Sequence, residues 1–92
     1  MEGQVALKGS WSWSRAWAIL DEQQFTFYKC LDTETQEPRG VLSLFHVKDA
    51  TISKISVKKR TFCVKVTSEN GQTVIVDTFN SVSAGHWYKA LL

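Results

Sequence analysis

The sequence contains no apolar run close to the ~20 residues that a membrane-spanning helix requires, and no secretory signal pattern opens it. Internal repeats, low-complexity tracts and linkers are also absent. Ninety-two residues suffice for one core. We therefore expect one domain over residues 1–92, located in the cytoplasm. Since the sequence starts with almost no lead-in and stops inside a helical pattern, we expect it to be excised from a larger multidomain protein.

A strong excess of charge of one sign is missing as well. The 11 basic and 9 acidic residues leave a formal net charge of +2, which is too small to indicate a nucleic-acid partner by itself. Trp11 and Trp13, in a Gly/Ser-rich stretch, offer stacking surfaces to single-stranded nucleic acid, but the low net charge argues against that use. We expect no nucleic-acid partner.

Catalytic and metal-binding patterns are not present. His46 and His86 lack the spacing and the cysteine partners of a metal site. No nucleophile is paired with a base, and no glycine-rich loop indicates a nucleotide. We therefore expect no enzymatic activity, no cofactor and no metal ion.

Only two cysteines occur, Cys30 and Cys63, and both lie in apolar, strand-like runs. They can pair only if the fold brings them together, which spacing does not decide. In the absence of a secretory signal, we expect two free, buried thiols in a reducing compartment.

The sequence does contain a series of short segments with alternating apolar residues. The clearest covers residues 15–29, where two apolar arms flank a short polar break. Trp17 and Ile19 share one face of the first arm, and Phe25 and Phe27 share one face of the second. This alternation predicts a β-hairpin of two half-buried strands.

Further strands are predicted on both sides of this hairpin. They cover residues 3–9, 41–45, 50–53, 61–67 and 73–78. Residues 31–40 are predicted to form a long surface loop, and residues 55–60 a basic connection that contains Lys58, Lys59 and Arg60.

The strongest turn signal in the chain is Asn70-Gly71, which tolerates the positive φ angles of a tight hairpin. It connects the strands over residues 61–67 and 73–78. In the first of these strands, alternation divides the side chains between two faces. Phe62, Val64 and Val66 are predicted to point inward, and Cys63 and Lys65 outward.

The last segment has the period of about 3.6 residues that is typical of an α-helix. Four side chains between Ala84 and Leu91 share one face, and Asn80 or Ser81 can cap the start. An antiparallel sheet of seven strands avoids bare edges by closing or by packing two sheets. We expect this helix to plug the remaining open end, with Trp87 in the core.

The order of these elements and several local strings resemble the pleckstrin homology (PH) domain family. The matching strings are Met1-Glu2-Gly3 with Lys8, W-A-I-L at residues 17–20, F-Y-K at 27–29, E-P-R-G at 37–40, K-R-T-F at 59–62, and Trp87 in the last helix. The resemblance covers essentially the whole chain. It implies a mostly β fold, namely a seven-stranded antiparallel, partly open barrel of two near-orthogonal sheets, capped by one C-terminal α-helix.

The resemblance also implies a site at the open end of the barrel, where the first two loops meet the headgroup of an inositol phospholipid. Tightly binding members carry a Lys late in the first strand and two basic residues around the start of the second. Lys8 matches the Lys, but Ser14 and Ala16 stand at the other two positions. We therefore expect weak binding. Lys29 and Arg39 match two further family positions.

A spectrin-like variant of the family grips the lipid on the outer side of the first loop. Lys8, Ser12, Trp13 and Arg15 fit that variant more closely. Trp11 and Trp13 are also predicted to contact the membrane, because amphipathic rings are stable at the lipid interface; the alternative is that one or both of them fold back on the barrel. The candidate headgroup ligands are thus Lys8, Ser12, Trp13, Arg15, Lys29 and Arg39.

The resulting prediction is a monomeric membrane-targeting module that weakly binds phosphoinositide-containing membranes and stays peripheral to them. The basic run at residues 58–60 is expected to add nonspecific attraction to an anionic leaflet. The alternative is a protein–protein interaction adaptor that uses the sheet face or the strand edges and binds little or no lipid. The uncharged residues at positions 14 and 16 favour this alternative.

Overall fold

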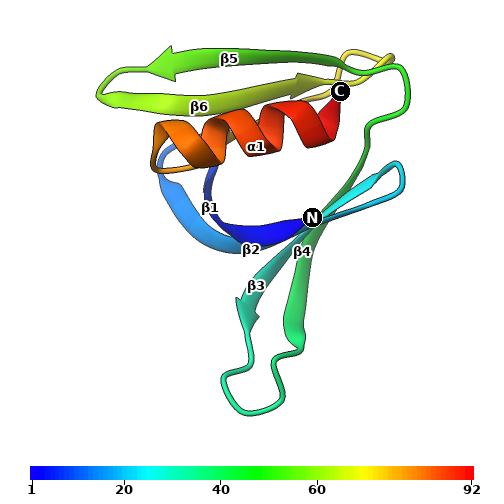
Figure 1. Cartoon of the computed structure of the whole chain (residues 1–92), viewed down its shortest axis with the longest axis vertical. Helices are drawn as coiled ribbons and strands as arrows, with labels where there is room; N and C mark the ends of the chain where they lie inside the picture. The colour runs from blue at the N-terminus through cyan, green and yellow to red at the C-terminus, as the bar shows by residue number, and fades with distance from the viewer.

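Seven strands followed by one helix make up the computed structural model, which describes residues 1–92 (Figure 1). The strands are β1 (Glu2–Lys8), β2 (Trp13–Asp21), β3 (Gln24–Leu31), β4 (Pro38–His46), β5 (Thr51–Val57), β6 (Arg60–Thr67) and β7 (Thr73–Asp77), and the helix is α1 (Ser81–Leu91). The predicted number and order of elements are confirmed.

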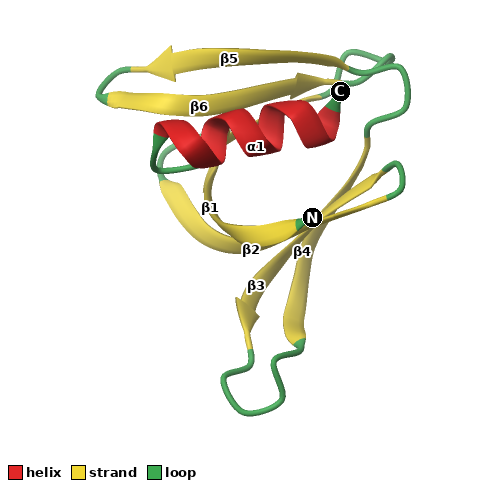
Figure 2. Ribbon diagram, viewed as in Figure 1, coloured by secondary structure: helices red, strands yellow, loops and turns green.

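The strands form one antiparallel sheet in the order β4-β3-β2-β1-β7-β6-β5. The connection between β1 and β7 is narrow, since only Ala6↔Asp77 and Leu7↔Val76 pair across it. The sheet folds back at this connection, and α1 lies between the β5–β6 pair and the β1–β2 pair in Figure 2. The predicted fold class is confirmed, and the two predicted sheets are continuous through β1 and β7.

The core lies inside this folded sheet and is closed by α1. Phe25 and Phe27 are fully buried, with ring centroids 4.5 Å apart, and the Trp87 ring lies 5.4 Å from Phe25. Trp87 is only 3% exposed, which confirms the prediction that it plugs the barrel. Asn80 is the helix cap, because its side chain accepts a hydrogen bond of 2.8 Å from the Ser83 N–H. The helix is not long and apolar enough to cross a membrane.

Two predicted boundaries are wrong. β5 continues to Val57, so the basic connection shrinks to a turn at Lys58 and Lys59. The β5–β6 register shifts between Ile55 and Val57, and this irregularity is why simple alternation ended the strand early. The predicted loop over residues 31–40 is also shorter, because Leu31 and Pro38 already pair between β3 and β4.

The predicted positions of three side chains are also wrong. Alternation predicts Phe62 inward and Cys63 outward, but Phe62 is 38% exposed and Cys63 is 1% exposed. The burial of Cys63 does agree with the expectation of a buried thiol. The outer face of β6 is covered at Cys63, which lies opposite Asp77 on β7, whereas Phe62 lies near the β5–β6 turn and outside the buried cluster. Cys30 is exposed rather than buried, because β3 has separated from β2 at that point. Both thiols are free, as expected.

Candidate functional site

The loop between β1 and β2 forms one rim of the barrel and carries several of the predicted ligands. It is closed by a hydrogen bond of 2.8 Å from the Gly9 N–H to the Ser12 carbonyl. A Cβ atom on Gly9 would lie 3.0 Å from that carbonyl oxygen, so glycine permits the tight closure. Lys8 and Trp13 pair across the base of the loop. Trp11 stands at its tip and is 99% exposed.

An inner cleft of about 510 Å³ opens between this loop and the middle of β4. Its lining residues are Leu7, Lys8, Gly9, Ser14, Arg15, Lys29, Leu42 and Ser43. The cleft brings together three of the six predicted headgroup ligands, Lys8, Arg15 and Lys29. None of these cations is ion-paired, and no carboxylate lines the cleft, so their charge is available to an anion.

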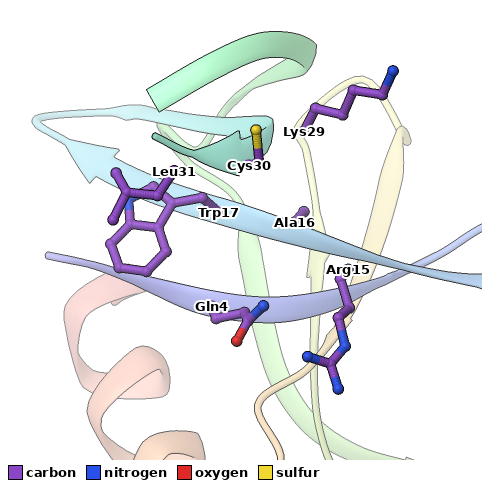
Figure 3. A pocket seen from close by; sticks show the side chains of 7 residues that line it. All are labelled: Gln4, Arg15, Ala16, Trp17, Lys29, Cys30 and Leu31. Atoms are coloured by element: carbon purple, nitrogen blue, oxygen red, sulfur yellow. The ribbon is translucent and has the colours of Figure 1, made fainter. Parts of the chain in front are cut away.

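The two central cations of this cleft do not point toward each other. Arg15 pairs with Ala6 between β1 and β2, which places its side chain on the outer face, whereas the neighbouring Ser14 faces inward. Figure 3 shows Arg15 and Lys29 pointing away from each other on opposite sides of β2. An anion in the inner cleft therefore meets one face of a cationic rim rather than a converging cage.

A smaller outer crevice of about 150 Å³ separates the β1–β2 loop from the β5–β6 turn. It is lined by Lys8, Gly9, Ser10, Trp11, Ser12, Trp13, Val57 and Lys58. The predicted residues Lys8, Ser12 and Trp13 are brought together here, but Arg15 does not line the crevice. Lys58 joins them. The basic run at residues 58–60 was the signal for it in the sequence, but its proximity to the first loop depends on the folding back of the sheet.

Arg60 holds Trp13 against the barrel. Its guanidinium group lies 4.5 Å from the centre of the Trp13 ring, and its Nη1 donates to the Asp77 carboxylate at 2.7 Å. The second carboxylate oxygen of Asp77 accepts a hydrogen bond of 2.9 Å from the Phe79 N–H. Trp13 is consequently half-buried, while Trp11 projects freely. Because its charge is compensated by Asp77, Arg60 supports the wall of the crevice and is not free to bind phosphate.

Arg39 is not brought to either cleft. It lies on β4 near the tip of the β3–β4 hairpin, which projects away from the rest of the barrel (Figure 1). Its guanidinium group is 3.7 Å from Asp32 and 3.6 Å from Glu37. Backbone N–H groups of Thr35 and Glu34 hold the pKa of the Asp32 carboxyl below its usual value, and Arg39 adds to this. The charge of Arg39 is thus balanced within its own hairpin.

Comparison with known proteins gives one family and a set of solved structures. A family model described as "PH domain" matches residues 1–92. The C-terminal PH domain of pleckstrin, in complex with a D-myo-inositol pentakisphosphate, is similar with a TM-score of 0.81 and 16% identity, over 99% of this chain and 89% of that chain. The Slm1-PH domain in complex with inositol-4-phosphate gives 0.79 and 13%, over 99% and 90%.

A third structure is the PH domain of human pleckstrin homology domain-containing protein family A member 5, with a TM-score of 0.73 and 19% identity, over 100% of this chain and 73% of that chain. At such identities these structures show a common fold and nothing finer. No curated protein sequence gives a match.

Proposed function

The chain belongs to the pleckstrin homology domain family, and on this premise we propose that it is a membrane-targeting module that weakly binds phosphoinositide headgroups at the inner cleft. The observation that carries the proposal is the presence of three unpaired cations, Lys8, Arg15 and Lys29, in a cleft without carboxylates. Phosphate groups are bound where cations and hydrogen-bond donors surround them. The hydroxyl groups of Ser14 and Ser43 add such donors.

Two similar domains support the choice of ligand, since the pleckstrin and Slm1 domains named above are complexed with inositol phosphates. Weak affinity follows from the residues on β2. Ala16 is 2% exposed and has no polar group, Ser14 is uncharged, and Arg15 projects to the outer face. Two charge-assisted contacts that the cationic family pattern would supply are therefore missing.

Trp11 is proposed to add a membrane contact to the headgroup contact. Its ring is almost fully exposed at the tip of the loop, and it lines the outer crevice together with the cations Lys8 and Lys58. An indole ring is stable at the headgroup level of a bilayer, and nearby lysines favour an anionic leaflet. Trp13 is held by Arg60, so we assign it to the wall of the outer crevice, which at about 150 Å³ offers far less room than the inner cleft for a headgroup.

Vesicle cosedimentation tests this proposal. Vesicles that contain a phosphorylated phosphatidylinositol should bind the chain better than neutral vesicles, and binding should fall as salt rises. The double variant Lys8→Ala/Arg15→Ala should bind about 30-fold more weakly, since each charge near the surface is worth about 1 kcal/mol. The matched control Lys48→Ala/Lys89→Ala removes the same charge from residues that line neither cleft and should lose much less.

Trp11→Ala separates the two contacts. This variant should bind the vesicles more weakly but bind a soluble inositol phosphate as the unmodified chain does. The proposal would be overturned if both double variants lost vesicle binding equally, or if vesicle binding did not depend on the phosphorylated phosphatidylinositol.

A further inference from the structure

A third cleft lies on the other side of the cationic rim, where β3 separates from β2. The β2–β3 ladder ends at Trp17↔Tyr28, although β2 begins at Trp13 and β3 continues to Leu31. The gap is about 380 Å³ in volume and is lined by Gln4, Arg15, Ala16, Trp17, Lys29, Cys30 and Leu31 (Figure 3). We call it the split-strand cleft.

We propose that the split-strand cleft binds an extended peptide segment in which an acidic residue lies two positions from an apolar one. This partner differs from the lipid proposed above, because Gln4, Trp17, Cys30 and Leu31 line the split-strand cleft and not the inner cleft. The two clefts share the cations Arg15 and Lys29.

The backbone favours an extended occupant. Residues 13–16 of β2 and 29–31 of β3 keep strand conformation beyond the point where the two strands stop pairing with each other. Backbone N–H and C=O groups require partners, and a strand of another chain supplies them in the manner of β-augmentation. On its other side, β2 is paired with β1 along this whole stretch, so only the β3 side is open.

The side chains select the chemistry of that occupant. Trp17 donates from Nε1 to the Glu2 carboxylate at 3.3 Å, and Leu31 lines the same cleft, so these two side chains contribute its apolar surface. Ala16 is too small to fill the gap. Arg15 and Lys29 are not ion-paired, and no carboxylate lines the cleft. The lining thus complements an apolar group next to negative charge.

The spacing follows from the strand geometry. Trp17 and Arg15 lie two residues apart on the same face of β2, which is about 6.6 Å along a strand. An extended segment beside β2 has the same repeat, so a side chain facing Trp17 and another facing Arg15 are also two positions apart. The intervening residue points to the opposite side, where Lys29 projects.

The probe for a test is a capped pentapeptide of sequence Asp-Ser-Leu-Ser-Asp, which presents the pattern in either chain direction. In an NMR titration of the labelled chain, it should shift the amide signals of Gln4, Trp17 and Leu31. The same peptide with lysine in place of aspartate should not. Leu31→Ser should weaken binding at least fivefold, whereas Leu42→Ser, a matched change in the inner cleft, should alter it less than twofold.

Cys30 gives a second, independent readout. It lines the split-strand cleft and is exposed, whereas Cys63 is 1% exposed, so a bulky maleimide should modify Cys30 alone in the folded chain. Modification should abolish peptide binding and leave inositol phosphate binding intact, and the peptide should slow the modification.

Several results would overturn the proposal. They are the absence of shifts at millimolar peptide, equal binding of the lysine peptide, and shifts confined to Ser14 and Ser43 of the inner cleft. Unchanged peptide binding after Cys30 is modified would overturn it as well, even if Leu31→Ser failed to fold. If the unmodified chain shows no peptide shifts while Lys8→Ala/Arg15→Ala loses vesicle binding, the split-strand cleft is refuted and the lipid proposal stands.

Discussion

Replacing Trp87 with alanine should destabilise the domain more than any other single tryptophan substitution. The Trp87 ring is 3% exposed, packs 5.4 Å from Phe25 and lies close to Gly3 on β1. It therefore joins α1 to the first strands of the sheet. Removing a buried tryptophan side chain costs about 3–5 kcal/mol, because transfer free energy is lost and a cavity remains. A domain of this size has only about 5–15 kcal/mol in total.

Urea unfolding followed by far-ultraviolet circular dichroism measures this loss. With a denaturant slope of about 2 kcal/mol/M, Trp87→Ala should lower the midpoint by roughly 2 M relative to the unmodified chain. Trp11→Ala is the matched control. Its side chain is 99% exposed, so its free energy of unfolding should change by less than about 0.5 kcal/mol.

Equal midpoints for the two variants would contradict this prediction. They would mean that α1 does not close the barrel through Trp87.

Three further perturbations follow from the structure. Arg60→Ala leaves the Asp77 carboxylate without its partner and should cost about 1–3 kcal/mol in urea unfolding, whereas Lys59→Ala should cost almost nothing; equal values would contradict the role given to Arg60. Asn80→Ala should cost about 1 kcal/mol, and Asn80→Ser should restore most of it; a Ser variant no better than Ala would refute the cap. The pKa of the Asp32 carboxyl is lowered mainly by the Thr35 N–H. The ionised carboxylate therefore stabilises the hairpin tip fully above about pH 3.9, the pKa of an unperturbed Asp. This stabilisation is lost as the pH falls through the lower pKa that Asp32 has in the folded state. After correction for the intrinsic pH dependence of amide exchange, the protection of amides at the hairpin tip should fall over that interval. Protection that stays unchanged across it would contradict this prediction.

The architecture could be predicted from sequence because local patterns report it directly. Alternation in the β2–β3 hairpin separates Phe25 and Phe27 from their polar neighbours, and the change of period marks α1. Both signals depend only on neighbours in the chain. The errors arise where a strand departs from regular pairing. The shift between Ile55 and Val57 is one such place, and the end of the β2–β3 ladder, which exposes Cys30, is another.

The candidate site was predicted less completely, because it depends on which loops meet. The sequence identifies Lys8, Arg15 and Lys29 as cations near the expected rim, and the inner cleft brings them together. It does not show that Arg39 is balanced by Asp32 and Glu37, because those contacts depend on the shape of the hairpin tip.

Two further features were missed because they depend on contacts between distant segments. The folding back of the sheet brings Lys58 next to the first loop. The Arg60–Trp13 contact joins residues that lie far apart in the chain and has no local signal in the sequence.

If the inner cleft binds inositol phosphate headgroups, a chemical-shift titration of the labelled chain with a soluble inositol phosphate should give saturable shifts at Lys8, Ser14 and Ser43. These shifts should weaken with added salt. Shifts restricted to other parts of the barrel, or no shifts at millimolar ligand, would contradict headgroup binding at this cleft.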